Sequence, residues 1–222
     1  IDARNPRTAN RAIPARLLGV REVVVFVAVS FVLLFIAAFN LDPLAIKLLP
    51  VAVFALVFYH YTKRFTWLCH VFLGFTIALG PLGGWLAVTG EASPAAYLLY
   101  VSVAFWTAGF DIVYACQDAE FDREARLHSI PARFGVRRAL ILARIFHIIP
   151  AFGFLVLFWM TDLSWGYLIG ALIALGILAW QHTLVKPEDL SRVNMAFFSM
   201  NGTLSVVLFA FTLFDLVVLR KW

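Results

Sequence analysis

Three aspartates, Asp111, Asp118 and Asp122, lie at the end of a long apolar run, where the sequence turns polar. At about 100° per residue, offsets of 7 and 11 residues bring all three within about 20° of one direction on a continuous helix. Clustered acids repel one another unless a cation neutralises them, and carboxylate oxygens are the ligands that Mg²⁺ prefers. The spacing therefore predicts an acidic stripe on one helix that binds magnesium.

The composition indicates a membrane protein: 63% of the 222 residues are hydrophobic, 14% are charged and the mean hydropathy is +0.89. A soluble domain of this size has no core large enough for so much apolar surface. Apolar runs in a bilayer must be helical, because a helix satisfies its own backbone hydrogen bonds. The sequence predicts an all-α, multi-span helical bundle with seven spans: Val23–Phe39, Leu44–Tyr59, Leu68–Val88, Ala95–Ala115, Ala139–Met160, Leu163–Leu184 and Ala196–Leu219. The first two are short for a hydrocarbon core of about 30 Å, and we expect them to tilt or to extend into flanking residues.

The basic residues divide unequally between the two sides of this bundle. Of the 18 Lys and Arg residues, 15 fall in the N-terminal segment and in loops on its side, whereas Lys47, Arg220 and Lys221 fall on the other side. Cytoplasmic loops carry such an excess, so we expect a multi-pass protein of the cell inner membrane with its basic loops in the cytoplasm. The net charge of +5 then reflects topology, and we expect the bilayer rather than nucleic acid as a partner.

Acids and bases occur together in three segments on the basic side, residues 2–21, 59–66 and 111–138. This combination is typical of a diphosphate site, because magnesium bridges carboxylates to phosphate oxygens while Arg and Lys neutralise the remaining charge. Some of these residues could instead form solvated salt bridges of little energetic value. Asp111 could orient Tyr114 or an arginine, and Tyr114 could either offer its hydroxyl or simply pack.

The chain opens at Ile1 within a polar, basic stretch, and its later connections are short. We interpret the opening as the middle of a loop, and expect residues upstream of it. Short connections favour one helical bundle, so residues 1–222 are expected to form a single domain.

The aspartate segment resembles the UbiA superfamily of intramembrane prenyltransferases. The second aspartate motif of that family, Asp-x3-Asp preceded by a Tyr and an earlier Asp, matches Asp122, Asp118, Tyr114 and Asp111. The resemblance extends over nearly the whole chain and involves three separate loops.

The two other loops carry the rest of the resemblance. The family's first motif, Asn-Asp-x2-Asp-x3-Asp, is followed by Arg-Thr-x-Asn-Arg, which matches residues 7–11 and makes Asp2 the last aspartate of that motif. A Tyr-x3-Lys-Arg-x-Thr segment matches residues 59–66.

The resemblance implies a bundle of nine spans, of which the first helix and most of the second would lie upstream of residue 1. The Asn and two Asp of the first motif would be upstream too, so we expect the 222-residue segment by itself to be inactive. Within the superfamily, residues 7–14, 59–66 and 111–135 are most similar to 4-hydroxybenzoate polyprenyltransferases of ubiquinone biosynthesis. A sub-branch that serves a futalosine-type menaquinone route, with a related aromatic acid, stays open.

The resemblance also implies a role for each motif residue. A polyprenyl diphosphate would place its tail among the helices and its head at the cytoplasmic loops, with an aromatic acid as acceptor. The implied catalytic residues are Asp111, Tyr114, Asp118 and Asp122; the metal ligands for Mg²⁺ are Asp2, Asp118 and Asp122; and the substrate-binding residues are Arg7, Asn10, Arg11, Tyr59, Lys63 and Arg64. Among these, Arg64 would hold the acceptor carboxylate, because a planar guanidinium matches it in bidentate fashion.

Two other classes of protein carry similar acidic residues in a membrane. CDP-alcohol phosphotransferases also carry Asp-x3-Asp, but their motif needs an upstream Asp-Gly where this chain has Tyr114 and Ala115. An ion-coupled carrier would place acids at mid-membrane, whereas these aspartates lie at the end of a span, and Arg144 and Asp215 also lie near span ends. A non-enzymatic carrier and a transferase with a different aromatic acceptor remain the alternatives.

Overall fold

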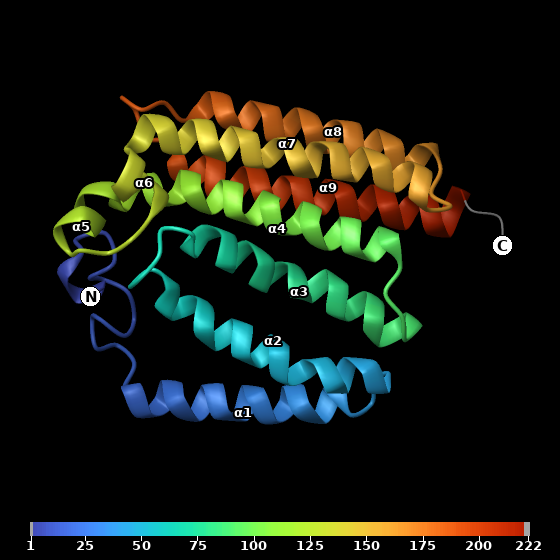
Figure 1. The fold of residues 1–222 in the computed structure, drawn as a ribbon, viewed down its shortest axis with the longest axis horizontal. Helices are drawn as coiled ribbons and strands as arrows, with labels where there is room; N and C mark the ends of the chain where they lie inside the picture. Colours follow the sequence, from blue (N-terminus) through green and yellow to red (C-terminus); the bar gives the residue numbers. More distant parts are fainter. Residues whose placement is uncertain (1, 220–222) are drawn as a thin grey trace.

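Seven long helices run side by side along one axis in the computed structural model, which describes residues 2–219 (Figure 1). They are α1 (Val20–Ala38), α2 (Pro43–Thr62), α3 (Cys69–Thr89), α4 (Pro94–Ala115), α7 (Val136–Met160), α8 (Trp165–Leu184) and α9 (Asn201–Phe214). Each is long and apolar enough to cross a membrane, α9 together with its flanking turns. The predicted all-α bundle with seven spans is therefore confirmed.

Short helical elements lie at the ends of the bundle or continue its long helices, as η3 and η4 continue α9. They are η1 (Asp2–Arg4), η2 (Cys116–Asp118), α5 (Ala119–Glu124), α6 (Ile130–Phe134), and the π-helical turns η3 (Met195–Met200) and η4 (Asp215–Leu219). The N-terminal segment, α5 and α6 lie together at one end of the bundle (Figure 1). This end carries the three segments in which the sequence combines acids and bases.

The two short predicted spans extend into their flanking residues, as expected. α1 has 19 residues and α2 has 20. α2 begins at Pro43 because Asp42 is its N-cap, with Oδ1 accepting a hydrogen bond from the N–H of Leu44 at 2.8 Å. Proline suits the first helical turn, where its missing N–H has no partner to lose.

The best-packed part of the molecule centres on α4, which packs against α3 on one side and α7 on the other. Small residues allow these close approaches. An added Cβ on Gly74 of α3 would lie 2.1 Å from the carbonyl oxygen of Ala104, and one on Gly153 of α7 would lie 1.9 Å from Oγ of Ser102. Close backbone contact through small residues is a common means of packing helices in membranes.

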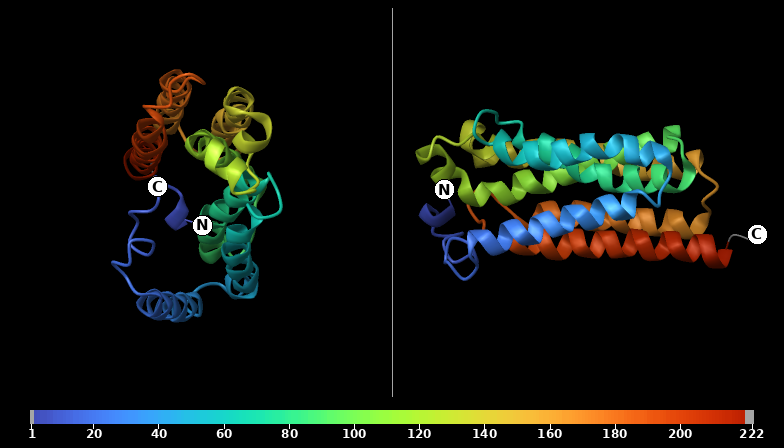
Figure 2. Two further views of the ribbon diagram at one scale, coloured as in Figure 1. Left: turned by 90° about the vertical axis from the view of Figure 1, so that its left-hand side faces the viewer. Right: turned by 90° about the horizontal axis from the view of Figure 1, so that it is seen from below.

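The outer helices α1 and α2 are strongly apolar, and their most apolar windows contain no buried residue. Viewed along the bundle, the helices follow an arc that runs from α1 through α4 to α9, with the N-terminal segment at one side (Figure 2). Helices with no buried face and high hydropathy are suited to contact with lipid.

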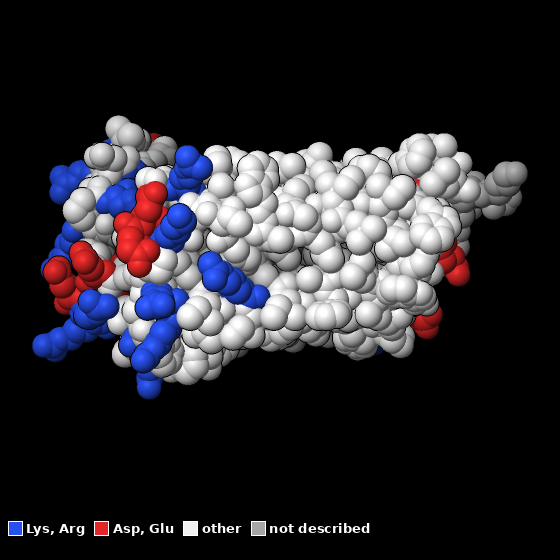
Figure 3. Space-filling model, turned by 90° about the horizontal axis from the view of Figure 1, so that it is seen from above, with Lys and Arg blue, Asp and Glu red and all other residues white. Residues whose placement is uncertain are grey.

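The charged side chains gather at the end of the bundle that carries α5 and the N-terminal segment, and the face in view is otherwise almost free of charge (Figure 3). Arg220 and Lys221, which the sequence assigned to the opposite side, lie outside the described residues. The described basic loops therefore share one end, as the charge count predicts.

The continuous helix expected through Asp122 is interrupted. α4 ends at Ala115, the three residues of η2 form a 3₁₀ turn, and α5 begins at Ala119. A 3₁₀ turn rotates about 120° per residue instead of about 100°, so three residues turn Asp118 and Asp122 by about 60° relative to Asp111. The prediction that the three aspartates share one stripe is therefore wrong.

Candidate active site

A cavity of about 1310 Å³ opens at the charged end of the bundle, between the N-terminal segment, α1, the end of α2, and α5. Seven of the residues singled out from the sequence line it: Asp2, Arg7, Arg11, Lys63, Arg64, Asp118 and Asp122. Asn10, Tyr59, Asp111 and Tyr114 are not among the lining residues. The three segments that carry the sequence motifs thus meet at one cavity.

Asp118 is held from the N-terminal segment. Arg7 donates from Nε to Oδ1 of Asp118 at 2.8 Å and from Nη2 to Oδ2, which makes a bidentate pair, and Asn5 donates from Nδ2 to Oδ1 at 2.8 Å. Arg7 also donates from Nη1 to the hydroxyl of Tyr114 at 2.8 Å. The hydrogen bonds to Asp118 raise the pKa of the Arg7 guanidinium above its usual value, so Arg7 stays charged.

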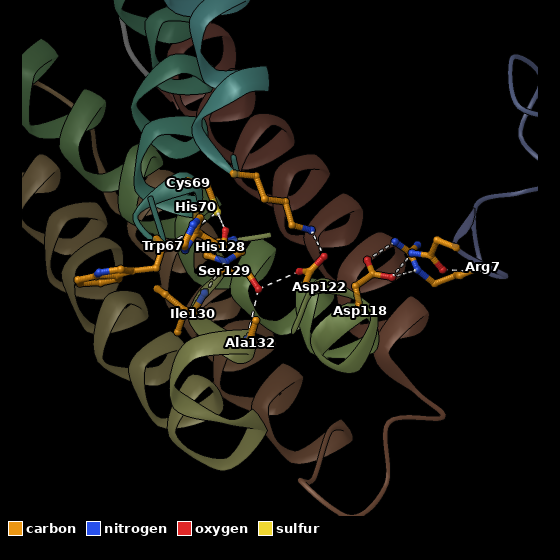
Figure 4. A network of polar contacts seen from close by, with 12 residues as sticks. Arg7, Trp67, Cys69, His70, Asp118, Asp122, His128, Ser129, Ile130 and Ala132 are labelled. Carbon is orange, nitrogen blue, oxygen red and sulfur yellow. Dashed lines mark hydrogen bonds and ion pairs between the residues drawn. The ribbon is translucent and has the colours of Figure 1, made fainter. Parts of the chain in front are cut away.

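Asp122 is held from two other directions. Nζ of Lys63 lies 2.8 Å from Oδ1, and the hydroxyl of Ser129 donates to Oδ2 at 2.8 Å (Figure 4). Asp122 is 1% exposed, and its Oδ1 makes no contact that meets hydrogen-bond geometry. The contact with Lys63 is therefore an ion pair, and Oδ1 keeps an acceptor position free.

Asp111 contacts neither of these aspartates. Its Oδ2 lies 2.7 Å from Nδ1 of His70, at the start of α3. The nearby Tyr59 belongs to the last turns of α2 rather than to the loop, and its ring lies beside that of His60 with centroids 4.0 Å apart. Asp111 and Tyr59 therefore do not line the cavity.

The remaining motif residues are more exposed. Arg64 is exposed, and its guanidinium lies 5.1 Å from the ring centroid of Tyr61. Asp2, Asn10 and Arg11 are exposed as well. Arg64 and Arg11 thus present cations to the cavity without an acidic partner among the ion pairs of the described residues.

Several residues at the site were missed in the sequence. Asn5 and Ser129 bind the two motif aspartates, and His60 lines the cavity. His70 had a usable signal, because it opens one span and Asp111 closes the next. Antiparallel neighbours place those two ends at the same membrane depth, where a buried histidine and a carboxylate are natural partners.

The donor set suits a hard divalent cation. Asp118, Asp122 and Asp2 offer carboxylate oxygens to one cavity, and Oδ1 of Asp122 has no hydrogen-bond donor. Within residues 2–219, no three His, Cys, Asp or Glu side chains converge closely enough to form a complete metal site. Arg7 and Lys63 neutralise the two buried aspartates, and a metal would replace that charge.

The sequence pattern of the UbiA prenyltransferase family matches residues 1–205. The chain belongs to this family. The resemblance found in the motifs is thus confirmed, and it identifies an enzyme family whose reaction is prenyl transfer. The fold agrees with that assignment.

Relatives of this UbiA-family chain include two named transferases. It is 27% identical over 201 residues to a 4-hydroxybenzoate octaprenyltransferase of Shewanella sediminis, covering 90% of this chain and 70% of the relative. It is 35% identical over 194 residues to a mitochondrial 4-hydroxybenzoate polyprenyltransferase of Arabidopsis thaliana, covering 86% of this chain and 46% of the relative.

Two solved structures share the fold of this UbiA-family chain. The apo structure of a UbiA homolog from Aeropyrum pernix K1 superposes with a TM-score of 0.88 at 26% identity, covering 97% of this chain and 80% of that one. A digeranylgeranylglyceryl phosphate synthase gives a TM-score of 0.70 at 18% identity, covering 94% and 74%. The second likeness concerns the fold alone.

Proposed function

We propose that the protein transfers a polyprenyl group from a polyprenyl diphosphate to the ring of 4-hydroxybenzoate, or of a related aromatic acid, in quinone biosynthesis, with Mg²⁺ as cofactor. The observation that carries the proposal is the convergence of Asp118, Asp122, Arg7 and Lys63 on one cavity at the end of a membrane bundle. The names of the relatives support 4-hydroxybenzoate as the acceptor.

The charges of the cavity suit a diphosphate. Arg7, Arg11 and Lys63 would bind phosphate oxygens, because fixed cations stabilise the charge that develops on a leaving diphosphate. Asp2, Asp118 and Asp122 would hold magnesium, which when bound supplies further positive charge next to that leaving group. Asn10 lies exposed on the same segment, and we propose it as a further substrate contact.

The reaction breaks the allylic C–O bond of the diphosphate and forms a C–C bond to the acceptor ring, ortho to its hydroxyl. The ring then loses the proton of that carbon, so prenylated acid, diphosphate and a proton leave the site. The chain's part is to neutralise the leaving group at Arg7 and Lys63 and to orient the acceptor.

Arg64 is the proposed contact for the acceptor carboxylate. It lines the cavity, it is exposed, and the ring of Tyr61 supports its guanidinium at 5.1 Å. A cation without a carboxylate partner, next to two that have one, is available to an anionic substrate. A planar guanidinium also matches a carboxylate in two-point contact.

We propose that the prenyl tail lies among the apolar helices, at the depth of the bilayer. The residues of the bundle that face outward are apolar, and the basic end fits the cytoplasmic face. Because several relatives are bacterial, we place the protein in the cell inner membrane, with residues 1–222 as a single transmembrane domain.

The test uses the full-length gene product in membranes or detergent with a polyprenyl diphosphate, 4-hydroxybenzoate and Mg²⁺. Mass spectrometry should detect a prenylated acid that vanishes with EDTA, returns with added Mg²⁺, and is absent in Asp118→Ala. Turnover with another aromatic acid but not with 4-hydroxybenzoate would support a prenyltransferase with that other acid as its acceptor. No turnover with any acceptor would overturn the transferase and favour a carrier.

A further inference from the structure

Asp111 pairs with a histidine, whereas the two motif aspartates pair with Arg7 and Lys63. Its Oδ2 is 2.7 Å from Nδ1 of His70, and the side chain of His70 is only 3% exposed. Asp111 does not line the cavity that Asp118 and Asp122 share. The partner of this carboxylate is therefore His70.

The second nitrogen of the His70 ring fixes the direction of that hydrogen bond. The backbone N–H of Ile130 donates to Nε2 at 3.3 Å. Because a backbone N–H can only donate, Nε2 must be the unprotonated nitrogen, and Nδ1 carries the proton that it donates to Asp111. Asp111 therefore selects the tautomer and orientation that let His70 hold Ile130.

Ile130 follows the serine that holds Asp122. The hydroxyl of Ser129 accepts a hydrogen bond from the N–H of Ala132 at 3.3 Å, which caps α6 and leaves its own proton for Oδ2 of Asp122 at 2.8 Å. Ser129 is 0% exposed, so water cannot replace either partner. Holding the backbone at Ile130 thus holds the hydroxyl that orients Asp122.

Residues 128–130 also contact the residues at both ends of the loop between α2 and α3. The N–H of His128 donates to the carbonyl oxygen of Lys63 at 2.7 Å, and Sγ of Cys69 donates to the carbonyl oxygen of His128 at 3.4 Å (Figure 4). Lys63 in turn pairs with Asp122. Residues 128–130 therefore set both groups that touch Asp122.

We propose that Asp111 and His70 are positioning residues, which hold residues 128–130 in place and thereby orient Asp122 toward the metal and the diphosphate. This inference rests on the proposed function in so far as Asp122 is a metal ligand there. The hydrogen bonds that link Asp111, His70 and Ile130 are present in the protein without substrate.

Four variants distinguish a positioning role of Asp111 and His70 from a direct role in the reaction. Asp111→Asn keeps an oxygen that accepts from Nδ1, and His70→Gln keeps one acceptor for Ile130 and one donor for Asp111, so both should retain transfer rates within about threefold of the parent. Asp111→Leu and His70→Leu remove the hydrogen bond between these two residues. They should therefore raise the half-saturating Mg²⁺ concentration about tenfold or more, as loss of an outer-shell partner does. Asp118→Asn is the reference for a direct role.

Hydrogen–deuterium exchange gives a readout that needs neither metal nor substrate. Peptides covering residues 122–134 should exchange faster in Asp111→Leu and His70→Leu than in the parent, and at the parent rate in Asp111→Asn and His70→Gln. Thr107→Val, an isosteric change of a buried residue one turn earlier on α4, is the control and should leave exchange in these peptides unchanged.

Two results would overturn the proposal. One is an Asp111→Asn variant that loses as much activity as Asp118→Asn while its exchange stays normal, because Asp111 would then act through its charge. The other is normal exchange in both leucine variants. If the parent enzyme prenylates none of the acceptors, the proposed function fails. The exchange comparison still decides whether Asp111 and His70 hold residues 128–130 in place.

Discussion

Nζ of Lys63 lies 2.8 Å from Oδ1 of Asp122, and Arg7 forms a bidentate pair with Asp118 in the same cavity. In this state each motif aspartate is paired with a cation that is also a candidate ligand for the diphosphate. A metal that binds the aspartates competes with those cations for the carboxylate charge, and a diphosphate gives the cations a new partner. Metal and diphosphate should therefore bind together.

Calorimetry can measure that coupling. Mg²⁺ should bind at least about tenfold more tightly in the presence of a non-reactive prenyl diphosphate analogue than in its absence, within the usual range of coupling between two sites. Lys63→Met should bind Mg²⁺ more tightly without the analogue and should bind the analogue more weakly. Equal Mg²⁺ affinities with and without the analogue would contradict this exchange of partners.

The two buried aspartates should be far more sensitive to loss of charge than their exposed neighbour. Asp118→Asn and Asp122→Asn should each lower the initial rate of prenyl transfer by about 100-fold or more, because groups that organise charge at the reacting centre contribute on that scale. Glu120→Gln removes the same charge from an exposed position of α5 and should change the rate by less than about twofold. Similar losses in all three variants would deny the aspartates a specific role.

Arg64 should act on one substrate only. Arg64→Ala should raise the KM for the aromatic acid by about tenfold or more and leave that for the prenyl diphosphate within about twofold, since a charged hydrogen bond to a carboxylate contributes about 1.5–3 kcal/mol. Arg138→Ala, which removes an exposed arginine outside the cavity, is the matched control. An equal rise of both KM values in Arg64→Ala would assign Arg64 to the diphosphate or to general folding.

Asp215 should matter for stability and not for the reaction. It is 0% exposed and accepts hydrogen bonds from the N–H and hydroxyl of Ser164 and from the N–H of Tyr167, the latter at 2.8 Å, at the start of α8. Asp215→Ala leaves these donors unpaired and should destabilise the fold by about 2–4 kcal/mol. A thermal unfolding scan in detergent should show a lower midpoint than for Glu91→Ala, an exposed acid at the same end of the bundle. An unchanged midpoint would exclude this capping role.

Much of the architecture could be predicted from local sequence. Apolar runs long enough to cross a bilayer gave the seven spans, since hydropathy and length decide insertion without reference to neighbours. The distribution of Lys and Arg placed the basic loops at one end. The motifs around Arg7, Lys63 and Asp118 indicated the family because residue types and spacings can be compared without knowledge of the tertiary structure.

Other features depend on how the helices pack and could not be read from spacing. The 3₁₀ turn at Cys116–Asp118 breaks the helix that the stripe assumed, and Asn5 and Arg7 contact Asp118 from a segment distant in sequence. The pairing of Asp111 with His70 depends on α3 and α4 being neighbours with matching rotations about their axes.

By itself, the sequence determined which segments are long and apolar enough to cross the membrane, which end carries the charges, and which residues we propose for binding a diphosphate. Only the tertiary structure decided which cation each aspartate takes, and that Asp111 faces His70 instead of the cavity. The reason is physical: insertion and orientation sum properties of single segments, whereas a hydrogen bond needs two side chains within about 3 Å. That distance is set by the rotation and contact of helices far apart in the chain.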